Sequence, residues 1–175
     1  LAQATQSGFN QYAPGDGVWL LREQLAQQFA QRDQIQLDPM TEITITPGAT
    51  IGLFATIQAV VHADDEVIIF DPSYDSYAPS VALVGGKAIH IALQPPHFSV
   101  DWEQVKSAIT AKTKLIIINT PHNPSGAIWS KQDWLTLIEL IRDSNILVLS
   151  DEVYEHLVFD GQRHYSALSF PELRE

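Results

Sequence analysis

The chain has 175 residues, of which 45% are hydrophobic and 18% charged, as in a globular protein with one sizeable core. Its net charge of −11 repels phosphate backbones, so we expect no nucleic-acid partner, and no apolar run approaches the roughly 20 residues that span a bilayer. Cysteine is absent, which excludes disulfides and thiolate metal sites and fits a cytoplasmic protein. The six histidines show no metal-site spacing, so we expect no bound metal.

The first part of the chain is predicted to be an arm or loop followed by a helix. Residues 1–15 are rich in polar residues, glycine and proline, and read as the arm or loop. Asp16 can cap a helix that runs to about Arg32, because apolar residues recur there at helical spacing. Residues 43–46 alternate like a short strand, which Pro47 and Gly48 end.

From residue 49 on, helical and strand patterns alternate. The predicted helices cover residues 49–62, 74–84, 101–109 and 130–142, and the predicted strands cover residues 66–70, 87–93, 115–118 and 146–149. Most of these strands are continuous apolar runs, as expected when both faces of a sheet are covered. The predicted fold class is therefore α/β, with a doubly wound, mainly parallel sheet. Ligands of such sheets bind just beyond the carboxyl ends of the strands.

Two turns that follow predicted strands carry candidate binding residues. Ala49 and Thr50 follow Gly48 at a strand-to-helix turn, where free amides, the helix dipole and a hydroxyl favour an anion such as phosphate. The alternative for this turn is a plain helix cap. Tyr74, in the sequence Asp-Pro-Ser-Tyr-Asp-Ser-Tyr, can cover one face of a planar cofactor. The alternative for Tyr74 is packing beneath the next helix.

Polar residues also follow the last two predicted strands. The segment Asn119–Gly126 reads Asn-Thr-Pro-His-Asn-Pro-Ser-Gly, and its two prolines suit a side chain, Asn123, that must hold one fixed hydrogen bond. Asp151 follows a buried run, where an unpaired carboxylate would be costly, so it needs a partner. A protonated ring nitrogen would serve, and Tyr154 can direct its hydroxyl into the same cleft. The alternative for Asp151 is an ordinary helix cap.

Together these motifs resemble those of the class I and II aminotransferases, which are fold-type I pyridoxal-phosphate enzymes. The resemblance rests on Asp-Pro-Ser-Tyr-Asp-Ser-Tyr-Ala-Pro at 71–79, Asn-Thr-Pro-His-Asn-Pro at 119–124 and Ser-Asp-Glu-Val-Tyr-Glu-His at 150–156. These phrases are most similar to those of bacterial methionine aminotransferases, in the kynurenine-aminotransferase-like branch. The resemblance implies part of the large domain of such an enzyme. It also implies transfer of an amino group from a hydrophobic or sulfur-containing, methionine-like amino acid to a 2-oxo acid.

The cofactor implied by the resemblance is pyridoxal 5′-phosphate. Ala49 and Thr50 match the positions that bind its phosphate. Tyr74 matches the aromatic residue that stacks on the pyridine ring, and Asn123 matches the asparagine that bonds the ring 3′-oxygen.

The resemblance also assigns the catalytic candidates and a second subunit. Asp151 matches the aspartate that pairs with the ring nitrogen and keeps it protonated, and Tyr154 matches a tyrosine that bonds the 3′-oxygen. Tyr12 matches a tyrosine that reaches the phosphate in the site of the partner subunit. A homodimer is therefore implied.

Two functional residues of the family pattern are missing from the chain. The Schiff-base lysine of the family lies beyond the Asp-x-x-Tyr motif, and none of the five lysines, at positions 87, 106, 112, 114 and 131, matches it. The arginine that grips the substrate carboxylate is also missing, and the chain starts without methionine. We therefore expect a chain truncated at both ends. It would comprise an arm or loop over residues 1–15 and part of the pyridoxal-phosphate-binding large domain over residues 16–175.

Other functions remain open on sequence alone. A carbon–sulfur lyase of the same fold would use the same visible residues. A non-catalytic effector-binding module, as in transcription regulators that carry an aminotransferase-like domain, would keep the fold without the reaction. A Rossmann dehydrogenase is disfavoured, because no glycine fingerprint follows the first predicted strand.

Overall fold

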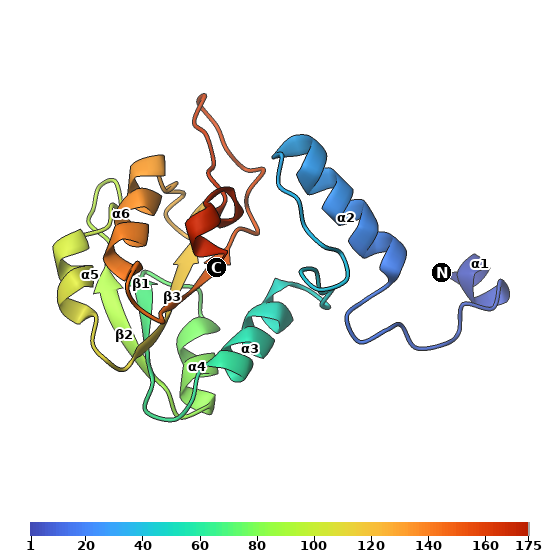
Figure 1. The fold of residues 1–175 in the computed structure, drawn as a ribbon, viewed down its shortest axis with the longest axis horizontal. Helices are drawn as coiled ribbons and strands as arrows, with labels where there is room; N and C mark the ends of the chain where they lie inside the picture. Colours follow the sequence, from blue (N-terminus) through green and yellow to red (C-terminus); the bar gives the residue numbers. More distant parts are fainter. Residues whose placement is uncertain (175) are drawn as a thin grey trace. The chain divides into compact units, whose positions relative to one another are not determined.

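The computed structural model describes residues 1–174, and the chain divides into two compact units, Leu1–Pro47 and the part from Gly48 on (Figure 1). The first unit contains helices α1 (Ala2–Gln6) and α2 (Trp19–Arg32). The expected division into an arm over residues 1–15 and a partial large domain over residues 16–175 stays a prediction, and residue 175 lies outside the described residues. Among residues 1–174, no helix combines the length and apolar character that a membrane crossing needs.

In the first unit, Asp16 forms an ion pair with a buried arginine instead of capping the helix as expected. Arg22 is only 5% exposed, and its guanidinium lies 2.5 Å from the Asp16 carboxylate. Asp16 therefore pairs with a residue inside α2, and the N-cap of the helix is Val18, so the predicted Asp16 cap was wrong. The predicted strand over residues 43–46 was also wrong. Among residues 1–174 no strand pairs with them, and the Ile45 amide donates to the Asp16 carbonyl instead.

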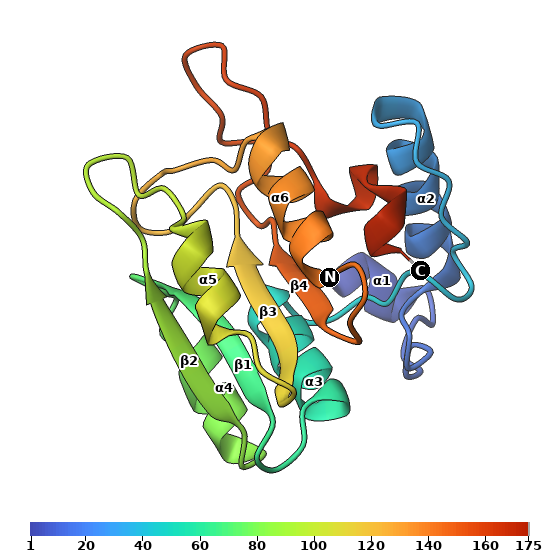
Figure 2. The same cartoon turned by 60° about the vertical axis from the view of Figure 1, so that its left-hand side comes forward.

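The second unit is built on a four-stranded parallel sheet. Its strands, in the spatial order β2-β1-β3-β4, are β1 (Glu66–Asp71), β2 (Lys87–Ala92), β3 (Thr113–Asn119) and β4 (Leu147–Asp151). Figure 2 shows helices on both faces of this sheet: α5 (Trp102–Ala108) and α6 (Lys131–Ile141) on one, and α3 (Ala49–Val60) and α4 (Tyr77–Leu83) on the other. Two short 3-10 helices follow, η1 (Ala167–Ser169) and η2 (Pro171–Leu173). The predicted α/β class with a doubly wound parallel sheet is thus confirmed.

Two hydrophobic cores lie on opposite faces of the sheet because side chains alternate along the central strands. In β1, Ile68 and Phe70 pack with α5 and α6, whereas Val67 and Ile69 pack with α3 and α4. Strand β3 divides its apolar side chains between the two cores in the same way. Because both faces are covered, these strands read in the sequence as continuous apolar runs.

Local hydrogen bonds set where the crossing helices begin. Asp101 caps α5 by accepting two first-turn amides at 3.1 Å, and Ser130 forms a reciprocal capping box with Asp133 at the start of α6. Helix α4 begins three residues later than predicted, because the Tyr77 amide donates to the Tyr74 carbonyl in a turn. This turn leaves Tyr74 in the loop beyond the carboxyl end of β1.

Candidate functional site

A pocket of about 440 Å³, including its part open to solvent, lies at the carboxyl ends of β3 and β4. Six of its lining residues are candidates from the sequence, brought together from positions 49 to 154. The full lining consists of Ala49, Thr50, Leu53, Tyr74, Asn119, Asn123, Asp151, Val153 and Tyr154. The seventh candidate, Tyr12, belongs to the first unit, and its side chain is fully exposed.

Asp151 is the buried carboxylate of this pocket, with 9% of its surface exposed. The Tyr77 hydroxyl donates to its Oδ2 at 2.6 Å, and the Val153 amide donates to its Oδ1 at 3.2 Å. Burial, and then the hydrogen bond to Asp151, raise the pKa of Tyr77 far above its ordinary value, so the phenol remains a donor. The sequence predicts that Asp151 needs a partner but does not identify Tyr77.

Asn119 links the ends of β3 and β4, which border the pocket, by a side-chain hydrogen bond. It is the register partner of Asp151 between β3 and β4, and its side-chain amide donates to the Asp151 carbonyl at 3.0 Å. Its Oδ1 accepts a hydrogen bond from the backbone amide of Asn123 at 2.7 Å. A buried polar side chain thus joins both strands to the loop that carries Asn123. The sequence places Asn119 in a functional motif without revealing this role.

The loop after β3 is held by its own hydrogen bonds. His122 is 7% exposed, its Nδ1 lies 2.7 Å from Ser125 Oγ, and its amide donates to the Ala127 carbonyl at 2.8 Å. Burial lowers the pKa of His122, which favours the neutral imidazole. Gly126 closes the turn at φ +74°, a left-handed conformation that suits glycine. The half-buried Asn123 side chain therefore projects to the pocket from an ordered loop.

A helix terminus and an aromatic ring complete the lining. Ala49 and Thr50 open α3, and the first amides of a helix have no acceptor within the helix itself. Together with the helix dipole, these amides favour an anion. The ring of Tyr74 is 37% exposed and meets the ring of Tyr77 edge to face, with centroids 5.8 Å apart. The pocket therefore combines an anion-favouring helix end, an aromatic ring and a buried carboxylate.

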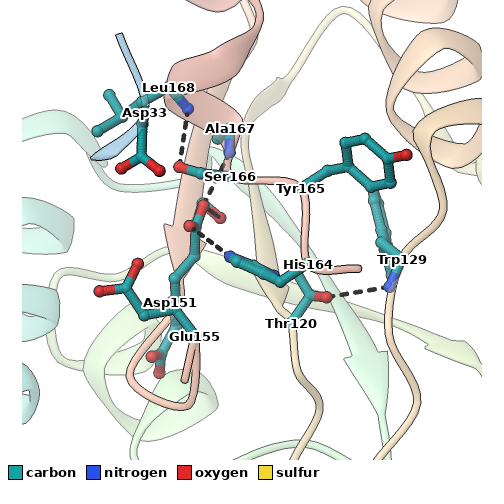
Figure 3. Close-up of polar contacts among 12 residues, drawn as sticks. Asp33, Thr120, Trp129, Asp151, Glu155, His164, Tyr165, Ser166, Ala167 and Leu168 are labelled. Carbon is teal, nitrogen blue, oxygen red and sulfur yellow. Dashed lines mark hydrogen bonds and ion pairs between the residues drawn. The ribbon is translucent and has the colours of Figure 1, made fainter. Parts of the chain in front are cut away.

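A second hydrogen-bond network, which the sequence did not predict, supports the segment that follows β4. The Glu152 carboxylate accepts from Ser150 Oγ at 2.7 Å, from His164 Nε2 at 2.9 Å and from the Ala167 amide at 2.8 Å. Figure 3 draws His164, Ser166 and Ala167 around this network. Ligand atoms of Glu152, Glu155 and His164 lie within 4.8 Å of one another. Because the Glu152 carboxylate is already engaged by these donors, we interpret the group as a structural support.

We expect Glu152→Gln to lower the stability of the full-length protein in a pH-dependent way. Burial opposes ionisation of Glu152, but hydrogen bonds from His164, the Ala167 amide and Ser150 outweigh it, so its pKa lies below the ordinary 4.5. The folded protein then binds fewer protons than the unfolded chain, and the stabilisation is present above pH 4.5 and lost as pH falls through the folded pKa. A loss of about 1–3 kcal/mol is expected near pH 7.

The free energy of unfolding in urea, measured for wild type and variant between pH 7 and about pH 3.5, tests this expectation. Glu139→Gln is the control, because the Glu139 side chain is 68% exposed and pairs with Arg142 on the surface. A difference between wild type and Glu152→Gln that stays constant over this range would contradict the assignment.

The sequence profile described as "Aminotransferase class I and II" matches residues 1–174. The chain belongs to the class I and II aminotransferases. Within this family, the methionine aminotransferase of Escherichia coli is 50% identical over 175 residues, which cover 100% of this chain and 45% of that protein. The chain therefore spans slightly less than half the length of this relative.

Solved aminotransferase structures show the same fold. The crystal structure of YbdL from Escherichia coli, reported with a methionine aminotransferase function, superposes with a TM-score of 0.96 at 50% identity, covering 99% of this chain and 46% of that one. N-succinyldiaminopimelate aminotransferase from Mycobacterium tuberculosis gives a TM-score of 0.89 at 39% identity, over 93% and 43% of the two chains. An aromatic aminotransferase from Pyrococcus horikoshii gives 0.90 at 35% identity, over 97% and 46%.

Proposed function

We propose that the full-length protein is a pyridoxal-phosphate-dependent aminotransferase. It would move the amino group of a hydrophobic or sulfur-containing, methionine-like amino acid to a 2-oxo acid. The observation that carries this proposal is the convergence of six candidate side chains in one pocket around the buried Asp151. The 50% identity to a methionine aminotransferase supports the substrate class.

The residues of the pocket fit pyridoxal phosphate. Each oxygen of the Asp151 carboxylate receives one donor from the chain and keeps a second acceptor direction for a ring N–H. The Thr50 hydroxyl and the first amides of α3 suit a phosphate group.

When bound, pyridoxal phosphate supplies a ring that takes up the negative charge left on the α-carbon of the amino acid after proton loss. Asp151 would hold the proton of the ring nitrogen through a charge-assisted hydrogen bond. Asn123 and Tyr154 would bond the ring oxygen and fix the ring orientation, and Tyr74 would cover a ring face. The lining residues within 1–174 include no lysine, so no residue described here is proposed as the Schiff-base lysine that holds the cofactor in the family.

A discontinuous assay of the full-length protein with methionine and 2-oxoglutarate tests the proposal. We expect glutamate and the 2-oxo acid of methionine to form in equal amounts. Release of a thiol and ammonia without glutamate would instead indicate a carbon–sulfur lyase. Binding of amino acids without any turnover by the cofactor-loaded protein would indicate an effector-binding module.

We further propose that the full-length protein is a cytoplasmic homodimer in which Tyr12 reaches the phosphate in the partner site. The exposed position of the Tyr12 side chain supports this role, because no contact among residues 1–174 buries it. Light scattering tests the dimer, and cell fractionation tests the cytoplasmic location. A monomeric mass for active protein would contradict the dimer, and recovery of the activity with membranes or the periplasm would contradict the location.

A further inference from the structure

Tyr77 is a core residue whose hydroxyl contacts Asp151, a lining residue of the proposed cofactor site. Its side chain is 2% exposed and packs among apolar residues between the sheet and helices α3 and α4. Its hydroxyl donates to Asp151 Oδ2 at 2.6 Å, which joins the first residue of α4 to the last residue of β4. Because a close-packed core holds the ring, the hydroxyl is a donor with a fixed position.

We propose that Tyr77 is a positioning residue that acts through Asp151. Its hydrogen bond fixes the rotation of the Asp151 carboxylate, so that a free acceptor direction is presented to the ring nitrogen of the cofactor. This inference rests on the proposed function. It deepens that function by assigning the control of the carboxylate to a residue that does not line the pocket.

The two hydrogen bonds to the carboxylate differ in strength and in setting. The bond from the Tyr77 hydroxyl is 2.6 Å long, within the range of charge-assisted O–H···O bonds, whereas the bond from the Val153 amide is 3.2 Å long. Val153 is also 59% exposed and lies in a surface turn, while Tyr77 is buried. Burial, and then the hydrogen bond to Asp151, raise the pKa of Tyr77, so its hydroxyl keeps its proton and donates. Tyr77 is therefore the dominant restraint on the carboxylate.

Tyr77→Phe in the full-length protein loaded with pyridoxal phosphate tests the inference, since it removes one hydroxyl and leaves the packed ring. We expect kcat to fall about 10- to 100-fold, the range expected for loss of a hydrogen bond to a charged group. The KM of the amino donor should change less than about threefold, because the change acts on the transition state. The absorbance band of the bound cofactor should also shift. Tyr165→Phe is the matched control, because Tyr165 packs in the opposite core, and it should alter neither reading.

A double-mutant cycle separates positioning through Asp151 from a general loss of structure. The dissociation constant of pyridoxal phosphate is measured by adding it to the cofactor-free apoprotein of wild type, Tyr77→Phe, Asp151→Asn and the double variant. We expect Tyr77→Phe to weaken binding about fivefold or more in the wild-type background and less than about twofold when Asp151 is asparagine. Equal effects in both backgrounds, or a Tyr77→Phe protein that matches Tyr165→Phe, would overturn the inference.

A second probe covers the case in which Tyr77→Phe does not fold. Incorporation of 3-fluorotyrosine at position 77 keeps the ring and the hydroxyl and makes the phenol a stronger donor. A shifted cofactor band and an altered kcat are expected, and an unchanged band and kcat would overturn the inference. Failure of the wild-type protein to bind pyridoxal phosphate would contradict the proposed function itself. The variants test only the role of Tyr77, so the two failures can be told apart.

Discussion

Replacement of Asp151 by asparagine is expected to reduce transamination by the full-length protein by orders of magnitude. The substitution removes the charge of the carboxylate and nearly preserves its shape. An amide holds the proton on the ring nitrogen less well, so the ring accepts less charge in the transition state. Each 1.4 kcal/mol of lost transition-state stabilisation lowers the rate about tenfold. Cofactor affinity should fall less than the rate, because the contacts that we propose for the phosphate at Ala49 and Thr50 remain.

Single-turnover transamination measures this effect, with cofactor occupancy followed by absorbance so that loss of binding is not mistaken for loss of chemistry. Asp160→Asn is the matched control, because Asp160 is an exposed loop residue with φ +56°, a conformation that asparagine adopts readily. A fully loaded Asp151→Asn protein that reacts within a few-fold of wild type would reduce Asp151 to a turn-forming residue. The proposed function would then lose the observation that carries it.

The largest effect on stability is expected from Trp134→Ala. Trp134 is fully buried, and its ring centroid lies 5.0 Å from that of Trp129 and 5.7 Å from that of Phe170. Its indole N–H donates to the Tyr165 carbonyl at 2.9 Å, which ties α6 to the segment before η1. Truncation would leave a cavity and an unpaired carbonyl, so we expect a loss of about 3–5 kcal/mol in the free energy of unfolding.

Urea unfolding of the full-length protein at pH 7 measures this loss, with the midpoint and the slope fitted separately. Leu135→Ala is the control on the same helix, because Leu135 is 41% exposed and should cost no more than about 1 kcal/mol. A loss below about 1 kcal/mol for Trp134→Ala would mean that the surrounding core closes over the missing ring.

The central strands and the pocket residues could be predicted from the sequence for physical reasons. Strands β1 and β3 are buried on both faces, so each contains four consecutive apolar residues and the run is easy to recognise. Strand β4 extends two residues beyond its apolar run, since Ser150 and Asp151 pair with the end of β3 in the ladder. Four of the six candidate residues of the pocket, Tyr74, Asn123, Asp151 and Tyr154, lie at or after the carboxyl ends of strands, where a parallel sheet gathers its ligand-binding loops. Ala49 and Thr50 instead open α3 without a preceding strand.

The remaining features depend on long-range geometry that local patterns do not contain. The bond from Tyr77 to Asp151 requires both the start of α4 and the position of β4, and their residues are 74 positions apart. Asn119 acquires its role from the register between β3 and β4. Residues 43–46 have the alternation of a strand but no strand beside them, and Asp16 engages Arg22 instead of the helix end. In each case a tertiary partner overrides the local preference.

The order in which the chain is made sets when the pocket can exist. Its lining begins at Ala49 and is complete only with Tyr154, and the last strand must pair with β3 before Asp151 meets Asn119 and Tyr77. A nascent chain that ends within β3 therefore has no binding site, whatever the state of its earlier helices. Capture of pyridoxal phosphate would accordingly mark the end of folding of this part of the protein. Free cofactor at 100 times its dissociation constant would then add about 2.7 kcal/mol to the stability of chains that reach that point.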